Sequence, residues 1–219
     1  MDRRRFMAQA VAAGMGMAAA SSAASAQRPV RIVGVSCSPR KGKTTATAIQ
    51  VALDAAKTVD SRIITELIDL GGMDIAGSNG GATAPDDDFS LILPKLKDPL
   101  PDGLIIGSPS YFRSMSALCK AFIERLAVLR SPTLQLAGRP VGALAVGAYR
   151  NGGQELVIQE ILTAMLCHEC MAVGGKPPAH QGATLWNAYS DDITKDELGI
   201  NSAKQLGIRL AEAALKLTP

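Results

Sequence analysis

Hydroxyl and cationic side chains are concentrated near the start of the chain, between residues 36 and 45. The hydroxyls are Ser36, Ser38, Thr44 and Thr45, and the cations are Arg40, Lys41 and Lys43. A helix is expected to begin at the end of this stretch, and helix N-terminal amides, hydroxyls and an arginine together form a good phosphate site. Cations at a helix start oppose the helix dipole by about 0.3–1 kcal/mol, so an anionic ligand is expected there. The plainer alternative is a solvated turn before a basic helix start.

The stretch lacks features that a nucleoside-triphosphate site requires. Gly42-Lys43-Thr44 is similar to the end of a nucleoside-triphosphate P-loop, but the position of the first glycine holds Cys37. Such an enzyme also needs a magnesium-binding Asp after a later strand. The segments after 106 and 146 begin Gly-Ser-Pro and Gly-Ala and offer none. A triphosphatase is therefore disfavoured.

Aromatic side chains are few, and most of them follow predicted strands. After residue 26 they are Phe89, Tyr111, Phe112, Phe122, Tyr149, Trp186 and Tyr189. Five of these seven lie in the loops after the third, fourth and fifth predicted strands, which favours a flat ring as ligand. Packing at the core edge or in a subunit interface is the alternative. A phosphate on the first loop and a planar heterocycle between the later loops together describe FMN.

The hydrophobic pattern predicts how these loops are positioned. Short apolar runs at 30–35, 62–70, 103–107, 140–147 and 171–173 predict strands, and helices are predicted at 43–57, 86–97, 115–129, 154–166 and 196–217. Strands alternating with helices indicate an α/β fold, a parallel sheet covered on both faces. We expect a flavodoxin-like three-layer sandwich with a five-stranded sheet of order 2-1-3-4-5. Ligands of such sheets bind beyond the carboxyl ends of the strands.

Four segments, taken together, resemble a known family. They are SPRKG at 38–42, DGLIIGSPSYF at 102–112, KAFIER at 120–125 and RNGGQE at 150–155. In this order and spacing they are similar to the NAD(P)H-dependent FMN reductase and iron–sulfur flavoprotein family, over most of residues 30–175. The resemblance implies FMN binding in a flavodoxin-like fold, NAD(P)H as a possible electron donor, and a homodimer or homotetramer.

The resemblance also implies roles for individual residues. By motif position, the residues that would hold the phosphate are Ser38, Arg40, Thr44 and Thr45. Those that would border the ring and the ribityl chain are Pro109, Ser110, Tyr111 and Phe112. Those that would approach the ring edge are Asn151, Gly152 and Gly153. To these we add Ser36, Lys43 and Tyr149 as binding residues. The iron–sulfur members carry a cysteine cluster after the second strand. Residues 75–84 contain no cysteine here, so no iron–sulfur cluster is expected.

The first 26 residues have the pattern of an export signal. Arg3-Arg4-Arg5-Phe6 precedes a short apolar stretch, and Ala24-Ser25-Ala26 forms a small-x-small cleavage site. The twin arginine predicts the corresponding export route and a periplasmic location. The apolar stretch is too short for a membrane anchor, which needs about 20 residues. The net charge of +3 comes mostly from this leader and does not indicate a nucleic-acid partner.

The cysteines and histidines leave fewer chemistries open. Cys167 and Cys170 form a C-x-x-C at a predicted helix end, which could be structural thiols or a local disulfide, a redox dithiol, or part of a metal site. A zinc site wants four ligands, and only His168 and His180 could complete one, so no metal is predicted. Cys37 and Cys119 are expected in the core. No G-x-S-x-G elbow is present for a hydrolase.

These observations predict an FMN-dependent oxidoreductase built as one domain over residues 27–219. It would pass electrons through FMN to a quinone, a metal ion or a small organic acceptor. No protein side chain is predicted to be catalytic, because the flavin ring itself accepts and passes electrons. The alternative is a non-enzymatic electron carrier of flavodoxin type in the periplasm.

Overall fold

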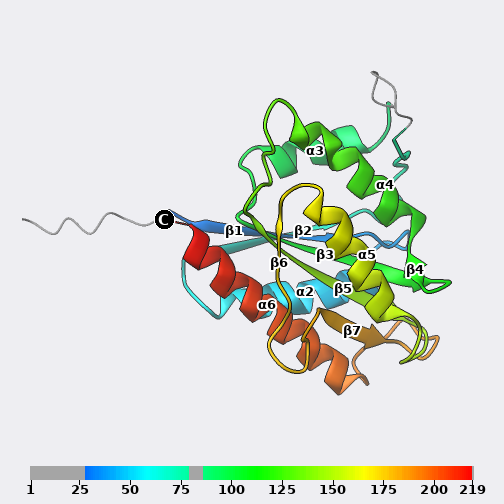
Figure 1. Ribbon diagram of the computed structural model, residues 1–219. Coiled ribbons are helices and arrows are strands. Elements are labelled where there is room, and N and C mark those ends of the chain that lie inside the picture. Colours follow the sequence, from blue (N-terminus) through cyan, green and yellow to red (C-terminus); the bar gives the residue numbers. More distant parts are fainter. Residues whose placement is uncertain (1–27, 79–85, 219) are drawn as a thin grey trace, which may run out of the picture.

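The protein is built on a parallel sheet with the order β2-β1-β3-β5-β6 (Figure 1). The computed structural model describes residues 28–78 and 86–218, so the predicted leader lies outside the described residues. The parallel strands are β1 (Val30–Ser36), β2 (Ile63–Asp69), β3 (Gly103–Tyr111), β5 (Pro140–Gly147) and β6 (Met171–Ala172). The predicted flavodoxin-like α/β class is confirmed.

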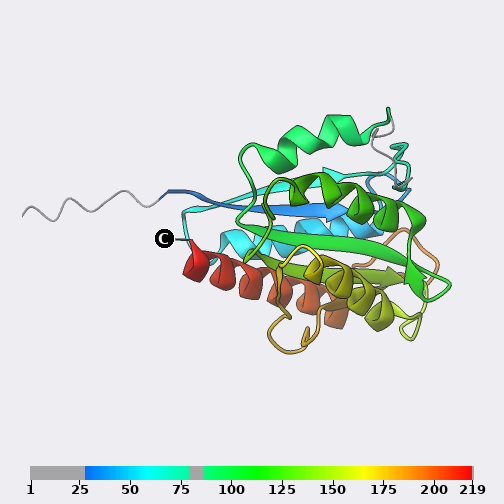
Figure 2. The same ribbon diagram turned by 45° about the horizontal axis from the view of Figure 1, so that its top comes forward.

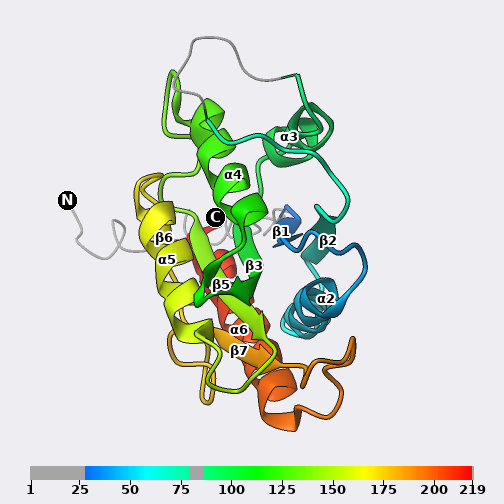
Figure 3. The ribbon, with the colours of Figure 1, turned by 90° about the vertical axis from the view of Figure 1, so that its right-hand side faces the viewer.

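Helices cover both faces of the sheet, which gives the three layers seen in Figure 3. On one face lie α2 (Thr44–Lys57) and α6 (Glu197–Leu217), and on the other α3 (Phe89–Lys97), α4 (Ala117–Arg125) and α5 (Gln154–Leu166). The strands are apolar on both sides because each face packs on a helix layer. In β1, Ile32 joins the core beneath α2 and α6, whereas Val33 and Val35 join the other. None of the helices in the described part of the chain is long and apolar enough to cross a membrane.

The prediction of five strands was wrong in number, because the sheet has seven. The strand β4 (Ser114–Met115) forms an antiparallel hairpin with β3, and β7 (Ala183–Trp186) runs parallel to β5. Two strands, β6 and β7, therefore share the fifth position of the sheet, next to β5. Strand β6 pairs with the start of β5 and β7 with its end. Residues 173–182 leave the sheet between them, and their Gly-Gly and Pro-Pro pairs disfavour a continuous strand.

Two predicted helices differ from the observed ones by more than one residue at an end. The helix expected at 86–97 begins only at Phe89, because Asp87 and Asp88 bind backbone N–H groups instead of entering the helix. Asp87 accepts from the N–H of Phe89 (3.1 Å) and Asp88 from that of Asp74 (2.8 Å). The helix expected at 115–129 is divided into α4 and a 3-10 turn, η1 (Leu126–Arg130).

A network around Asp102 fixes the start of β3 and predicts a pH dependence of stability. The carboxylate accepts two bonds from Arg28 (both 2.9 Å), one from the N–H of Arg31 (2.9 Å) and one from Arg139 (3.3 Å). Burial raises the pKa of Asp102, but these hydrogen bonds and the charges of Arg28 and Arg139 lower it more, so the pKa lies below its ordinary value. The stabilisation is therefore present above the unfolded pKa, about 4, and lost as pH falls through the lower folded value.

We expect Asp102→Asn to reduce the free energy of unfolding by about 1 kcal/mol at neutral pH and to make the melting temperature less sensitive to acid. Circular dichroism melts between neutral and strongly acidic pH measure both effects. Asp98→Asn, which alters an exposed carboxylate in the same connection, is the matched control and should keep the wild-type profile. An unchanged acid response in the Asp102 variant would contradict the assignment.

Candidate functional site

The loops after β1, β3 and β5 meet at one edge of the sheet. The strands run toward the right-hand end of the molecule in Figure 2, where this edge lies. The N–H of Cys37 donates to the carbonyl of Gly107 (2.8 Å), and the Ser116 hydroxyl donates to the carbonyl of Cys37 (2.7 Å). The Ser110 hydroxyl donates to the carbonyl of Gly152 (2.6 Å) and so joins the β3–β4 hairpin to the loop after β5. The predicted site segments are therefore neighbours.

The loop after β1 is supported from the end of β2. The N–H of Gly42, which has a positive φ of 66°, donates to Asp69 (2.7 Å). Gly71 passes so close to this loop that a Cβ there would lie 2.2 Å from the Cα of Lys41. The Ser38 hydroxyl accepts from the N–H of Arg40 (3.2 Å). The loop is therefore held in shape before any ligand binds.

The N-terminus of α2 offers donors that fit a phosphate. Lys43 occupies the N-cap position, its side chain makes no capping hydrogen bond, and the first turn contains no acidic residue. Thr44 and Thr45 are buried there. The buried Ser36 hydroxyl has no hydrogen-bond partner among the described residues, and Ser36 lies on the face of β1 that α2 covers. An uncapped helix start beside hydroxyls is suited to an anion.

Two of the three cations of this loop, Arg40 and Lys43, contact a carboxylate from a distant part of the chain. Asp191 accepts from Arg40 at 2.5 Å with one oxygen and lies 3.0 Å from Lys43 Nζ with the other. All three side chains are about half-exposed. The hydrogen bond from Lys43, followed by that from Arg40, lowers the pKa of Asp191 below its ordinary value. Asp191 carries no signal in the sequence, because nothing local marks a residue in a polar loop as a partner of residues about 150 positions earlier.

Four of the five predicted loop aromatics are exposed at this edge, namely Tyr111, Phe112, Tyr149 and Tyr189, whereas Trp186 is partly buried. At the tip of the β3–β4 hairpin, Phe112 and Arg113 both have positive φ, and the Phe112 side chain is fully exposed. Tyr111 and Tyr149 are exposed as well. The rings of Tyr149 and Tyr189 meet edge to face with centroids 4.9 Å apart. The rim is therefore an open aromatic surface, reached from solvent.

The glycines after β5 allow a close approach between loops. Gly153 has φ 91°, and a Cβ there would lie 2.7 Å from the Cα of Arg113. The Gln154 side chain donates to the carbonyls of Tyr149 (2.5 Å) and Leu185 (3.0 Å). A hollow of about 310 Å³ adjoins this loop and includes Asn151 and Gly153, but neither Tyr111 nor Phe112.

Arg150 orients the same loop from its outer side. Its guanidinium donates to Asp196 (2.5 Å) and lies over the Trp186 ring, 5.3 Å from the centroid. Asp196, which is buried, also caps α6 through the N–H of Gly199 and accepts from the N–H of Trp186. Local sequence signals did not predict this cluster.

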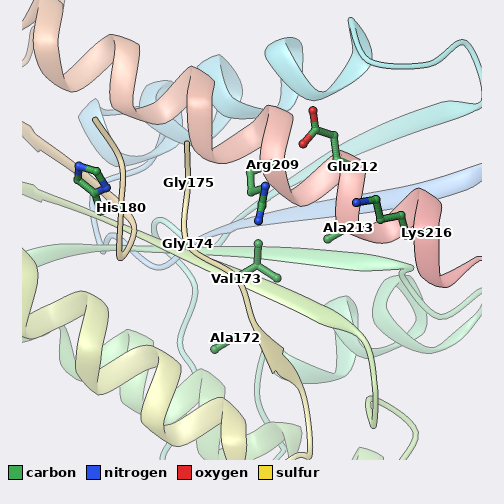
Figure 4. A pocket seen from close by; sticks show the side chains of 9 residues that line it. All are labelled: Ala172, Val173, Gly174, Gly175, His180, Arg209, Glu212, Ala213 and Lys216. Carbon is green, nitrogen blue, oxygen red and sulfur yellow. The ribbon is translucent and has the colours of Figure 1, made fainter. Parts of the chain in front are cut away.

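A second hollow, of about 350 Å³, lies away from all predicted site residues (Figure 4). It is formed by β6, the segment that follows it and the C-terminal half of α6. Its lining is Ala172, Val173, Gly174, Gly175, His180, Arg209, Glu212, Ala213 and Lys216. Because β6 pairs with the start of β5, this hollow adjoins the strand end opposite the candidate site.

The cysteines are four free thiols. Cys37 and Cys119 are buried neighbours, and burial followed by the Cys119 thiol raises the pKa of Cys37. Cys170 donates to the carbonyl of Leu136 (3.5 Å), and burial raises its pKa to about 11. Because the thiolate is the reactive form, this environment argues against a redox dithiol with the exposed Cys167. Within residues 28–78 and 86–218, no three His, Cys, Asp or Glu side chains are grouped to hold a metal ion.

The chain matches the model of a protein family named NADPH-dependent FMN reductase over residues 30–184. The chain belongs to this family. The match begins at β1 and ends within β7, so it includes the loops after β1, β3 and β5 but not Tyr189 or Asp191.

Relatives agree with this family. An iron–sulfur flavoprotein of Methanocaldococcus jannaschii is 37% identical over 191 residues, which is 84% of this chain and 96% of the relative. An iron–sulfur flavoprotein of Methanosarcina thermophila is 31% identical over 182 residues, 81% of this chain and 93% of the relative. A protein of Archaeoglobus fulgidus named NAD(P)H dehydrogenase (quinone) is 31% identical over 119 residues, 53% of this chain and 61% of the relative.

Solved structures share the fold. RosB with a bound riboflavin-phosphate intermediate superposes with a TM-score of 0.67 at 14% identity, covering 86% of this chain and 80% of that one. An NADH:FMN oxidoreductase, EmoB, gives a TM-score of 0.57 at 23% identity, covering 85% and 89%. As a member of this family, the chain binds FMN and is an FMN-dependent oxidoreductase. The absence of an iron–sulfur cluster stays a prediction.

Proposed function

We propose that FMN binds along the carboxyl edge of β1, β3 and β5, and that its phosphate occupies the uncapped start of α2. The observation that carries this proposal is the helix N-terminus with no side-chain cap and no acidic residue in its first turn. Beside it lies the buried Ser36 hydroxyl, which has no partner in the part of the chain that the structure describes. The phosphate residues would be Ser36, Ser38, Arg40, Lys43, Thr44 and Thr45. A phosphate there satisfies the free amides, the hydroxyls and the cations together.

The ring is proposed to lie against the aromatic rim. Tyr111, Phe112 and Tyr149 offer apolar faces, and Pro109 and Ser110 border the ring and its chain. Asn151, Gly152 and Gly153 approach the ring edge, where backbone groups without a Cβ come close. Bound FMN supplies the electron transfer itself, and the side chains bind and orient it.

Electrons are proposed to come from NAD(P)H and to pass to a quinone, a metal ion or a small organic acceptor. The open rim supports this assignment, because a donor and an acceptor can each approach it from solvent. The name NAD(P)H dehydrogenase (quinone) of one relative supports a quinone as the acceptor.

Anaerobic titration of the FMN-loaded protein tests the donor. We expect NADH or NADPH to bleach the visible flavin absorbance, and a soluble benzoquinone to restore it. Dithionite is the control that shows the flavin is reducible. If dithionite bleaches the flavin and neither nicotinamide does, the reductase assignment is wrong and the electron-carrier function remains.

Export and oligomerisation are proposed on the sequence pattern and the family. The leader with Arg3-Arg4 supports export to the periplasm by a route that carries folded, cofactor-loaded cargo. Cell fractionation of wild type against a variant with Arg3→Lys and Arg4→Lys tests the route, since retention of the variant alone in the cytoplasm is expected. Sedimentation of the FMN-loaded protein tests for a homodimer or homotetramer.

A further inference from the structure

The segment after β7 contacts two loops of the proposed FMN site. We call residues 187–192 the strap. Its start is held to the sheet, because the N–H of Asn187 donates to the carbonyl of Gly147 (3.0 Å). From there it reaches the loop after β5 through the ring contact of Tyr189 with Tyr149, and the loop after β1 through Asp191. The strap therefore bridges the two parts of the site that the ring and the phosphate would occupy.

The contact of Asp191 is made with the phosphate-binding cations themselves. One carboxylate oxygen accepts from Arg40 and the other contacts Lys43, so the carboxylate bridges both. The first turn of α2 has no acidic residue, and Asp191 adds its negative charge to that of Asp69, which accepts from the N–H of Gly42 in the same loop. A carboxylate that bridges two cations at a helix start offers what a phosphate would offer there, namely negative charge and acceptor oxygens.

The phosphate of FMN and Asp191 would compete for the same donors. A phosphate carries up to two negative charges, and placing it beside an ionised carboxylate on the same two cations is opposed by like-charge repulsion. Because Asp191 and both cations are about half-exposed, the contact is weak and can be exchanged for a phosphate.

We propose that Asp191 occupies the phosphate site of the flavin-free protein, and that the phosphate of FMN displaces it and the strap. The inference rests on the proposed position of the phosphate. It makes Asp191 a specificity residue that lowers affinity for phosphorylated flavins only, because riboflavin has no phosphate to compete with the carboxylate.

The test is the binding of FMN and of riboflavin to flavin-free Asp191→Asn, measured by quenching of flavin fluorescence. We expect the Kd for FMN to fall about five- to tenfold and the Kd for riboflavin to stay at its wild-type value. Asp192→Asn is the matched control. It removes the neighbouring charge of the strap, but the Asp192 carboxylate accepts from Thr194 (2.7 and 2.8 Å) and forms no ion pair with Arg40 or Lys43. Its Kd for FMN should be that of wild type.

The other outcomes overturn the inference in distinguishable ways. Weaker FMN binding in Asp191→Asn would mean that Asp191 holds Arg40 in place for the phosphate. An equal gain in FMN affinity in Asp192→Asn would show that the effect comes from the net charge of the strap and not from the contact of Asp191. An unchanged Kd for FMN in Asp191→Asn would show that Asp191 and the phosphate do not compete. Arg40→Ala would then tell whether Asp191 alone has no role or whether the phosphate site itself is misplaced. Weaker binding by Arg40→Ala keeps the phosphate site and removes only the role of Asp191, whereas unchanged binding removes the phosphate site as well.

Discussion

Arg40→Ala is expected to weaken FMN binding by about 10- to 100-fold. The side chain lies at the start of α2 beside three buried hydroxyl residues, Ser38, Thr44 and Thr45. A charge-assisted hydrogen bond to a phosphate is worth about 1.5–3 kcal/mol, which corresponds to this range of Kd. Reconstitution of the flavin-free protein, followed by flavin fluorescence, gives the Kd.

Two controls make the result specific to the phosphate. Lys57→Ala removes an exposed cation at the far end of the same helix, where its nearest carboxylate is Asp54 at 4.0 Å, and should leave the Kd unchanged. Riboflavin should bind wild type and Arg40→Ala with nearly equal affinity. Equal FMN binding by wild type and Arg40→Ala would show that the phosphate lies elsewhere.

Arg125→Met is expected to lower the free energy of unfolding by about 3–5 kcal/mol. Arg125 and Asp87 form an ion pair with side chains only 8% and 6% exposed. The guanidinium also lies over the Phe89 ring, 4.8 Å from its centroid, and donates to the carbonyl of Ala76 (3.3 Å). Removing the guanidinium leaves the Asp87 charge buried without a cation and held only by the N–H groups of Ala76 and Phe89 among the described residues, which is far more costly than losing an exposed pair. Urea unfolding followed by circular dichroism measures the loss.

The exposed pair on the same helix is the matched control. Lys120→Ala removes the partner of Glu124 one turn away and should cost less than about 1 kcal/mol, because exposed pairs contribute little. Adding Asp87→Asn to Arg125→Met should recover part of the lost stability, since it removes the stranded charge. A loss below about 1 kcal/mol in Arg125→Met would show that water reaches this pair and compensates it.

Elements with a clear local pattern were predicted to the residue. The strand β5 (Pro140–Gly147) is an apolar run between Arg139 and a polar loop, and α5 (Gln154–Leu166) begins directly after two glycines. The parallel-sheet rule then placed the loops after β1, β3 and β5 at one edge, where hydrogen bonds join them. Composition, periodicity and motif spacing are local properties, so they were sufficient for these features.

Features that depend on long-range pairing were not predicted. Strand β7 is only four residues long, and it is a strand because β5 offers free backbone groups at its end. The two-residue strand β4 exists only because the β3 hairpin folds back on itself.

The sequence by itself determined the family, the layers of the fold and the loops that face the ligand, because each follows from a residue pattern within a short segment. Only the tertiary structure decided that β6 and β7 share the fifth position of the sheet and which charged side chains contact one another. Arg40 and Lys43 contact Asp191 because β7 carries the strap to the edge where β1 ends. Contacts between residues about 150 positions apart depend on the complete sheet, and no local pattern encodes them.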